Sequence, residues 1–83
     1  MSADELIQRY VEANPHRPGL DEARLRDYGV PVWALVGHLE AVDDDICQVA
    51  SDYHLPREAV EAALAYYRRY RPLIDARIAA NAA

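Results

Sequence analysis

Apolar positions recur at helical spacing on both sides of a short break in the second half of the chain. Before the break, one face of a helix is marked by Ile46, Val49, Ala50 and Tyr53. After it, a second stripe begins with Val60, Ala63, Leu64 and Tyr67. His54 lies at the break, where such a turn needs a left-handed backbone that histidine tolerates. The pattern predicts two short helices packed crosswise over the small Ala50, which is a helix-turn-helix.

The remaining periodicity predicts further helices. Ser2 and Glu5 have capping-box spacing, so a helix is expected from about residue 3 to 13, ended by Asn14-Pro15. A second helix, residues 31–40, would begin at Pro31. Its apolar stripe is Val32, Leu35, Val36 and Leu39. Trp33 falls off this stripe and is expected to cover the neighbouring extended segment.

Turn residues and prolines set the other boundaries. Residues 24–32 are expected to form either a small hairpin or an extended lead-in. One aspartate of residues 43–45 is expected to cap the first helix of the motif. The second helix of the motif would reach about Arg71, and Pro72 would either kink it or start a separate helix. Residues 79–83 are expected to fray.

These elements predict an all-α fold, a small homeodomain-like helix-turn-helix bundle, with a short extended or hairpin segment near residues 24–32 as an addition. The chain is expected to be a single domain, residues 1–83. Its predicted parts are an N-terminal helix (1–13), an extended linker (14–30), the helix-turn-helix core (31–71) and a C-terminal helix or tail (72–83).

The long helix carries two apolar stripes instead of one. The stripe expected to face the core contains Val60, Leu64, Tyr67, Ile74 and Ile78. The other contains Ala59, Ala62, Tyr66, Tyr70 and Leu73. Small residues followed by tyrosines suit a close helix–helix contact, which predicts a homodimer or partner interface on this second stripe. The alternative is that Tyr66 and Tyr70 pack under the N-terminal helix.

Composition bears on disulfide formation and on the cellular compartment expected for the protein. The chain has 83 residues and a net charge of −5, and Cys47 is its single cysteine. A disulfide within the chain is therefore excluded, and Cys47 is expected to be a partly buried small hydrophobe. No signal-peptide pattern and no apolar run of about 20 residues is present, so a cytoplasmic protein without membrane association is expected.

Charge is unevenly distributed, and this bears on nucleic-acid binding. Residues 1–55 carry four arginines against eleven acidic residues, and residues 56–83 carry five arginines against three. Candidate DNA contacts are Arg57, at the start of the second helix of the motif, and three arginines near its end: Arg68, Arg69 and Arg71. Glu58 and Glu61 on the same surface oppose phosphate binding. Arginines near a helix C-terminus are equally explained by the helix dipole.

Catalytic and metal chemistry find little basis in the sequence. The acidic residues 40–45 lack the ligand spacing and central glycine of a calcium loop. His16, His38 and His54 are not spaced as metal ligands. No nucleophile–base pair or phosphate-binding glycine loop is recognisable. We expect a protein that is not an enzyme, with no cofactor, metal or small-molecule substrate.

Residues 24–67 resemble domain-of-unknown-function family 433. The resemblance is carried by Val30-Pro31-Val32, Asp45-Ile46, Val49-Ala50, Asp52-Tyr53, Leu55, Val60 and the run Ala62-Ala63-Leu64-Ala65-Tyr66-Tyr67. It implies a helix-turn-helix fold, often preceded by short strands and often dimeric. Several members are described as antitoxins encoded beside a PIN-like toxin, which implies toxin neutralisation and operator-DNA binding. The alternative is a homodimeric protein-interaction module that does not bind DNA.

The chain departs from the family pattern at one place. Members usually carry a glycine-rich segment ending in Gly-Thr-Arg before the aliphatic-Pro-Val element. Here that position holds Arg26-Asp27-Tyr28-Gly29. Any function of the family that depends on its extended N-terminal region is therefore in question for this chain.

Overall fold

Helices form most of the chain, and a two-stranded antiparallel sheet completes it. The computed structural model describes residues 1–82. Its elements are α1 (Ala3–Tyr10), β1 (Val11–Glu12), the 3-10 helix η1 (Leu20–Glu22), β2 (Arg24–Leu25), α2 (Val32–Ala41), α3 (Ile46–Tyr53), α4 (Arg57–Arg69) and α5 (Arg71–Ala82). The predicted fold class, mostly helical with a short extended segment, is confirmed.

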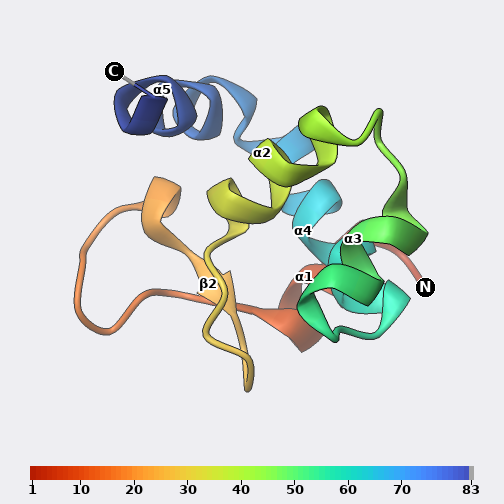
Figure 1. The fold of residues 1–83 in the computed structure, drawn as a ribbon. Helices are drawn as coiled ribbons and strands as arrows, with labels where there is room; N and C mark the ends of the chain where they lie inside the picture. Colours follow the sequence, from red (N-terminus) through yellow and green to blue (C-terminus); the bar gives the residue numbers. More distant parts are fainter. Residues whose placement is uncertain (83) are drawn as a thin grey trace.

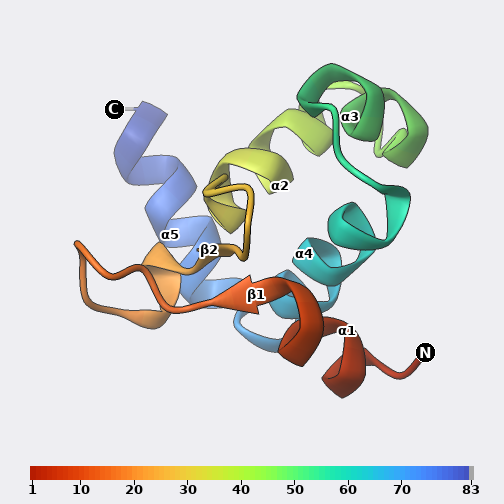
Figure 2. The ribbon, with the colours of Figure 1, turned by 90° about the horizontal axis from the view of Figure 1, so that it is seen from below.

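Helix α4 is the centre of the fold. It contacts α1, α2, α3 and α5 as well as β1, and Figures 1 and 2 show it enclosed by these elements from several sides. The apolar stripe predicted for α2 lies in the core: Val32, Leu35, Val36 and Leu39 are all buried. Val60 and Ala63 of α4 are fully buried in the same hydrophobic cluster. Burial of this apolar surface is the main stabilising contribution.

The predicted turn of the helix-turn-helix is confirmed. His54 follows α3 with φ 55° and ψ 47°, the left-handed conformation. The N–H of Leu55 donates to the carbonyl oxygen of Ala50 at 2.9 Å, which closes the end of α3. Pro56 then precedes α4, where its missing N–H leaves no hydrogen bond unmade. One of the three aspartates at residues 43–45 was predicted to cap α3, and the structure shows that it is Asp45, which accepts from the N–H of Gln48 at 3.1 Å.

Helix α1 is shorter than predicted. The predicted Ser2 cap is confirmed, because the Ser2 hydroxyl accepts from the N–H of Glu5 at 3.2 Å. The Glu5 carboxylate accepts from the Ser2 hydroxyl instead of the Ser2 N–H, so the reciprocal half of the capping box is not formed. The helix ends at Tyr10 instead of residue 13. Val11 leaves the helix because it pairs with Leu25 in the β1–β2 sheet. A strand of two residues has no periodic pattern, so nothing in the local sequence marks it.

The segment 24–32 contains a tight reversal, so of the two alternatives the small hairpin is correct. The N–H of Leu25 donates to the carbonyl oxygen of Val30 at 2.8 Å, and the N–H of Gly29 donates to that of Leu25 at 2.9 Å. Asp27 and Gly29 take positive φ angles of 70° and 71° to make the turn. Pro31 lies just before α2, so this helix begins one residue later than predicted.

Two helices replace the single long one at the C-terminus. Tyr70, with φ −122°, ends α4 slightly before the predicted boundary at Arg71. Pro72 is the second residue of α5, a first-turn position that needs no N–H, so the separate helix is the correct alternative. Helix α5 continues to Ala82, so the predicted fraying from residue 79 is wrong for residues 79–82. Ala83 lies outside the described residues.

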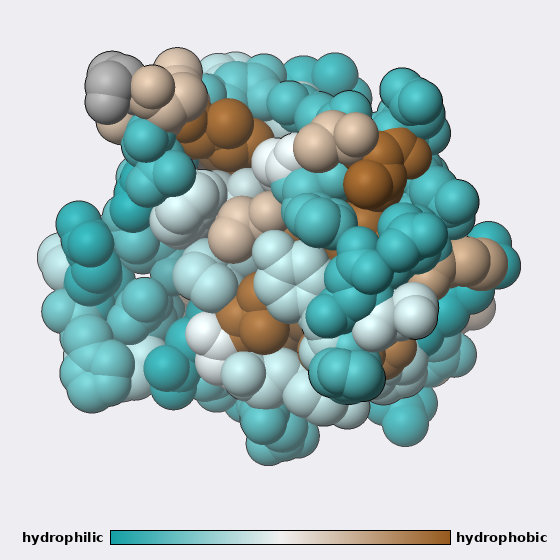
Figure 3. All heavy atoms as spheres, viewed as in Figure 1, coloured by the Kyte–Doolittle hydropathy of each residue, from teal (hydrophilic) through white to brown (hydrophobic). Residues whose placement is uncertain are grey.

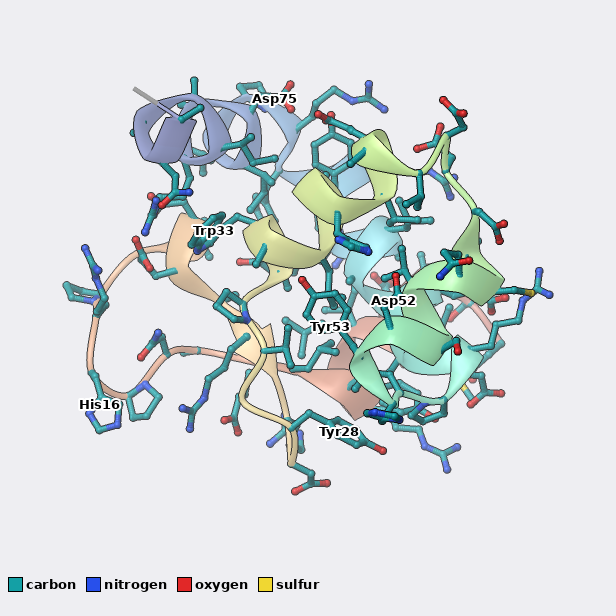
Figure 4. The ribbon with its side chains drawn as sticks, viewed as in Figure 1. His16, Tyr28, Trp33, Asp52, Tyr53 and Asp75 are labelled. Carbon is teal, nitrogen blue, oxygen red and sulfur yellow. The ribbon has the colours of Figure 1, made fainter. Side chains whose placement is uncertain are left out.

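Two further side chains lie elsewhere than predicted. Trp33 faces α5, where the Arg77 guanidinium carbon lies 4.2 Å from its ring centroid. Figure 4 shows Trp33 between α2, η1 and α5. Cys47 is exposed, in contrast to the predicted partial burial. It lies on the outer face of α3, and its sulfur accepts a hydrogen bond from Arg57 at 3.7 Å.

Candidate functional site

The second apolar stripe of the long helix faces the protein interior over most of its length. Ala59 and Ala62 are fully buried, and Tyr66 is 6% exposed. Helix α1 packs along α4, and its Ile7 lines the same surface hollow as Tyr66. These three residues are therefore unavailable to a second copy, and the predicted interface is corrected at these positions. The alternative, packing under the N-terminal helix, holds for Tyr66.

The outer end of this stripe remains at the surface. Tyr70 is half-buried, with its ring centroid 4.8 Å from that of Tyr66. Leu73 is 45% exposed. Of the predicted interface residues, these two alone retain surface that a partner could contact, and for them the interface stays a prediction.

Tyr66 also holds the start of η1 against α4. Its hydroxyl donates to the carbonyl oxygen of Leu20 at 2.6 Å. Burial raises the pKa of Tyr66 to about 12, because the phenolate would lose its hydration. The side chain is therefore a structural anchor between α4 and residues 13–23.

Two polar contacts join α1 to α4. Asp4 accepts from the guanidinium of Arg69, and the Tyr10 hydroxyl donates to Glu58 at 2.8 Å. The Tyr10–Glu58 hydrogen bond raises the pKa of Tyr10. Both contacts engage side chains at opposite ends of α4 that would otherwise be free to meet a ligand.

The four arginines proposed for DNA contact differ in their surroundings. Arg57 forms an ion pair with Glu61 at 2.9 Å, and this hydrogen bond raises the pKa of Arg57. Arg69 is held by Asp4. The guanidinium of Arg71 lies 4.9 Å from the ring centroid of Tyr67. Arg68 is exposed. Two of the four therefore already contact carboxylates of the same chain.

Acidic side chains gather where α2 meets α3, and we call this group the acidic corner. Its members are exposed and come from the end of α2, the connecting loop and α3: Glu40, Asp43, Asp44, Asp45 and Asp52. Asp43 and Asp44 have φ angles of 55° and 61°, a conformation that aspartate tolerates better than most residues. On the face seen in Figure 3, hydrophobic residues form small separate patches within a mainly hydrophilic surface.

One contact at this corner was not predicted. His38 Nε2 lies 2.8 Å from an Asp52 carboxylate oxygen, joining α2 to α3. The Gln48 side chain donates to the other oxygen at 2.7 Å. These hydrogen bonds, first that of His38, lower the pKa of Asp52. The 14-residue separation of His38 and Asp52 gives no local signal, and only the Gln48–Asp52 spacing of one helical turn is readable in sequence. In Figure 4 Asp52 and Tyr53 reach from α3 toward α2.

Within residues 1–82, no group of three or more His, Cys, Asp or Glu side chains is placed to hold a metal ion. No helix of this part of the chain combines the length and the apolar character needed to cross a membrane. The features of these residues that bear on function are therefore their charged surface and the packing of their helices.

Comparison with known proteins identifies the family of this chain but no individual relative. Curated proteins gave no match, and neither did solved structures. The family match covers residues 21–67, from η1 to most of α4, and leaves α1, β1 and α5 outside. These 47 residues are more than half of the chain, and they contain the segment whose resemblance was predicted. The chain belongs to the DUF433 family, which is described as "Protein of unknown function".

Proposed function

We propose that this protein is an antitoxin-type binding protein that neutralises a basic partner protein, a PIN-type nuclease being the class that the family resemblance indicates. In this proposal the acidic corner contacts the partner protein, and the chain does not recognise a DNA sequence. The observation that carries the proposal is the placement of α4: the helix that would read DNA packs against α1, α2, α3 and α5, and its exposed start carries a glutamate beside a paired arginine.

A recognition helix needs a protruding face rich in cations. The face of α4 formed by Ala59, Ala62 and Tyr66 is covered by α1. The first turn of α4 presents Glu58 beside Arg57, and Arg57 is neutralised by Glu61. Each carboxylate near a phosphate opposes binding, so the exposed start of α4 is a poor surface for DNA.

The acidic corner has the properties of a surface that attracts a cationic protein. It is exposed, and four of its carboxylates, those of Glu40, Asp43, Asp44 and Asp45, form no ion pair among the described residues. Unpaired surface charge accelerates the encounter with an oppositely charged partner and selects against partners of like charge. The surrounding helices α2 and α3 are joined by the hydrogen bond between His38 and Asp52.

The test uses the product of the gene adjacent to this one in its native genome, purified and mixed with the full chain. We expect a complex whose affinity falls with added salt. In Asp43→Asn with Asp44→Asn, binding should weaken about tenfold, because two charges are lost while asparagine tolerates the same left-handed backbone.

Asp27→Asn is the matched control, because Asp27 is also exposed with a positive φ but lies at the tip of the hairpin. It should leave the affinity unchanged. Absence of a complex with the adjacent gene product would contradict the proposal. Equal weakening by the control and the double variant would contradict the assignment of the acidic corner.

A further inference from the structure

One narrow stripe of α4 remains open to solvent between its covering helices. It consists of Glu61, Leu64, Ala65 and Arg68, which share a helix face at i, i+3, i+4 and i+7 spacing. Leu64 and Ala65 are partly buried and Arg68 is exposed. The stripe lies where α4 passes between α1 and α3, an arrangement visible in Figure 2.

The stripe forms the floor of a surface hollow of about 300 Å³. Ala3 and Leu6 of α1 bound the hollow on one side, and Ile46 of α3 bounds it on the other. A second hollow of about 390 Å³ shares Ile46, Leu64 and Arg68 with the first, so the two are continuous past Arg68. The centre of the stripe is thus apolar, and the small Ala65 permits close approach of another helix.

The charges at the two ends of the stripe are self-complementary. Glu61 lies one turn before the Leu64–Ala65 pair, and Arg68 lies one turn after it. A two-fold axis between Leu64 and Ala65 would run a second α4 antiparallel to the first. Each Glu61 would then face Arg68 of the other copy, and apolar residues would meet at the centre. This is the defining property of an isologous interface, in which one patch is its own partner.

The existing contacts leave both charges able to take part. Glu61 accepts from Arg57 through Oε1, which leaves its other carboxylate oxygen for a second donor. Arg68 has no ion-pair partner within the described part of the chain, whereas Arg57, Arg69 and Arg77 each have one. A long, exposed arginine beside a hollow can also fill that hollow on the opposite copy.

We propose that a second copy of this chain docks on the stripe Glu61-Leu64-Ala65-Arg68, forming a two-fold dimer with antiparallel α4 helices. This interface shares no residue with the buried Ala59-Ala62-Tyr66 stripe or with the acidic corner, and it adjoins that corner where Glu40 and Asp44 line the second hollow. It is also independent of any partner protein.

The test is the oligomeric state of the full chain, measured by sedimentation over a range of protein concentration. The unchanged protein should be a dimer. Glu61→Arg places like charges opposite each other twice in the dimer, and Arg68→Glu does the same with the opposite sign. Each variant should dissociate with a constant raised about 30-fold, the effect of two exposed ion pairs lost.

Mixing the two variants supplies the sharper result. The arginine introduced by Glu61→Arg then faces the glutamate introduced by Arg68→Glu, and the native Arg68 of the first variant faces the native Glu61 of the second. A heterodimer should therefore form from two dimerisation-defective proteins. Arg9→Glu, a charge reversal of an exposed residue on α1, is the control and should leave the dimer unchanged.

Three results would overturn the proposal: a monomeric unchanged protein at the highest concentration, a dimer insensitive to both reversals, or a mixture that fails to associate. Circular dichroism checks that each variant is folded. If one reversal prevents folding, Ala65→Arg replaces it, because this residue lies at the centre of the stripe; an unchanged dimer in that variant would equally refute the interface.

Discussion

Tyr66 gives the most informative perturbation of the fold, because its hydroxyl is both buried and hydrogen-bonded. Tyr66→Phe removes the hydrogen bond to the Leu20 carbonyl. At neutral pH we expect a loss of about 1 kcal/mol in the free energy of unfolding, the usual net contribution of one such bond. The loss stays small because Leu20 is half exposed and water can replace the lost donor.

The same residue predicts an alkaline transition. Its pKa is about 12 in the folded state and near 10.0 when unfolded. The folded state therefore holds the phenol proton more tightly. The resulting stability is fully present below pH 10 and is lost as the pH rises from 10 through 12. At about pH 11 the loss amounts to about 1.4 kcal/mol.

Urea unfolding followed by circular dichroism between about pH 8 and pH 11 measures both effects. The difference in stability between the unchanged protein and Tyr66→Phe should shrink to zero or invert by about pH 11. Leu73→Ala is the control, since Leu73 is 45% exposed and carries no titratable group, and its difference from the unchanged protein should not vary with pH. A Tyr66→Phe difference that stays constant across this pH range would refute the reasoning.

Three further predictions concern the core, the turn and the corner. Leu35→Ala, at a fully buried position, should cost about 2–5 kcal/mol in chemical unfolding, whereas Leu73→Ala at an exposed one should cost less than about 0.5 kcal/mol. His54→Gly should raise the melting temperature slightly and His54→Val should lower it, because only glycine takes the left-handed turn without strain. In carboxyl NMR titrations Asp52 should have a pKa below its ordinary value, and His38→Asn should return this pKa toward that value. The hydrogen bond from His38 stabilises the fold at pH values above the pKa that Asp52 has in the unfolded chain. This stabilisation is lost as the pH falls through the pKa that Asp52 has in the folded protein.

Local sequence signals predicted the elements that depend on local chemistry. The helix-turn-helix followed from apolar spacing and from the left-handed tolerance of His54. The caps at Ser2 and Asp45 followed from residue type and position. These features depend on neighbours within a few residues, so a single chain carries enough information to place them.

Features that depend on contacts between distant segments were missed or misplaced. The β1 strand exists because Val11 meets Leu25, a pairing with no local pattern. The second stripe of α4 was correctly identified as apolar. Whether α1 or a second copy of the protein covers it depends on how the chain folds back on itself, which local sequence does not encode. The stripe at Glu61 and Arg68 was readable from its spacing, and only the structure shows that it is the part of α4 left open.

Binding to DNA tests the central claim, that this DUF433 protein recognises a protein and does not read DNA. The measurement is fluorescence anisotropy of a labelled fragment from upstream of its own gene, titrated with the full chain at about 50 mM salt, where phosphate contacts are strongest. We predict no affinity above that for an unrelated fragment of equal length. A complex at least about tenfold tighter with the upstream fragment, and abolished by Arg57→Ala, would contradict the account.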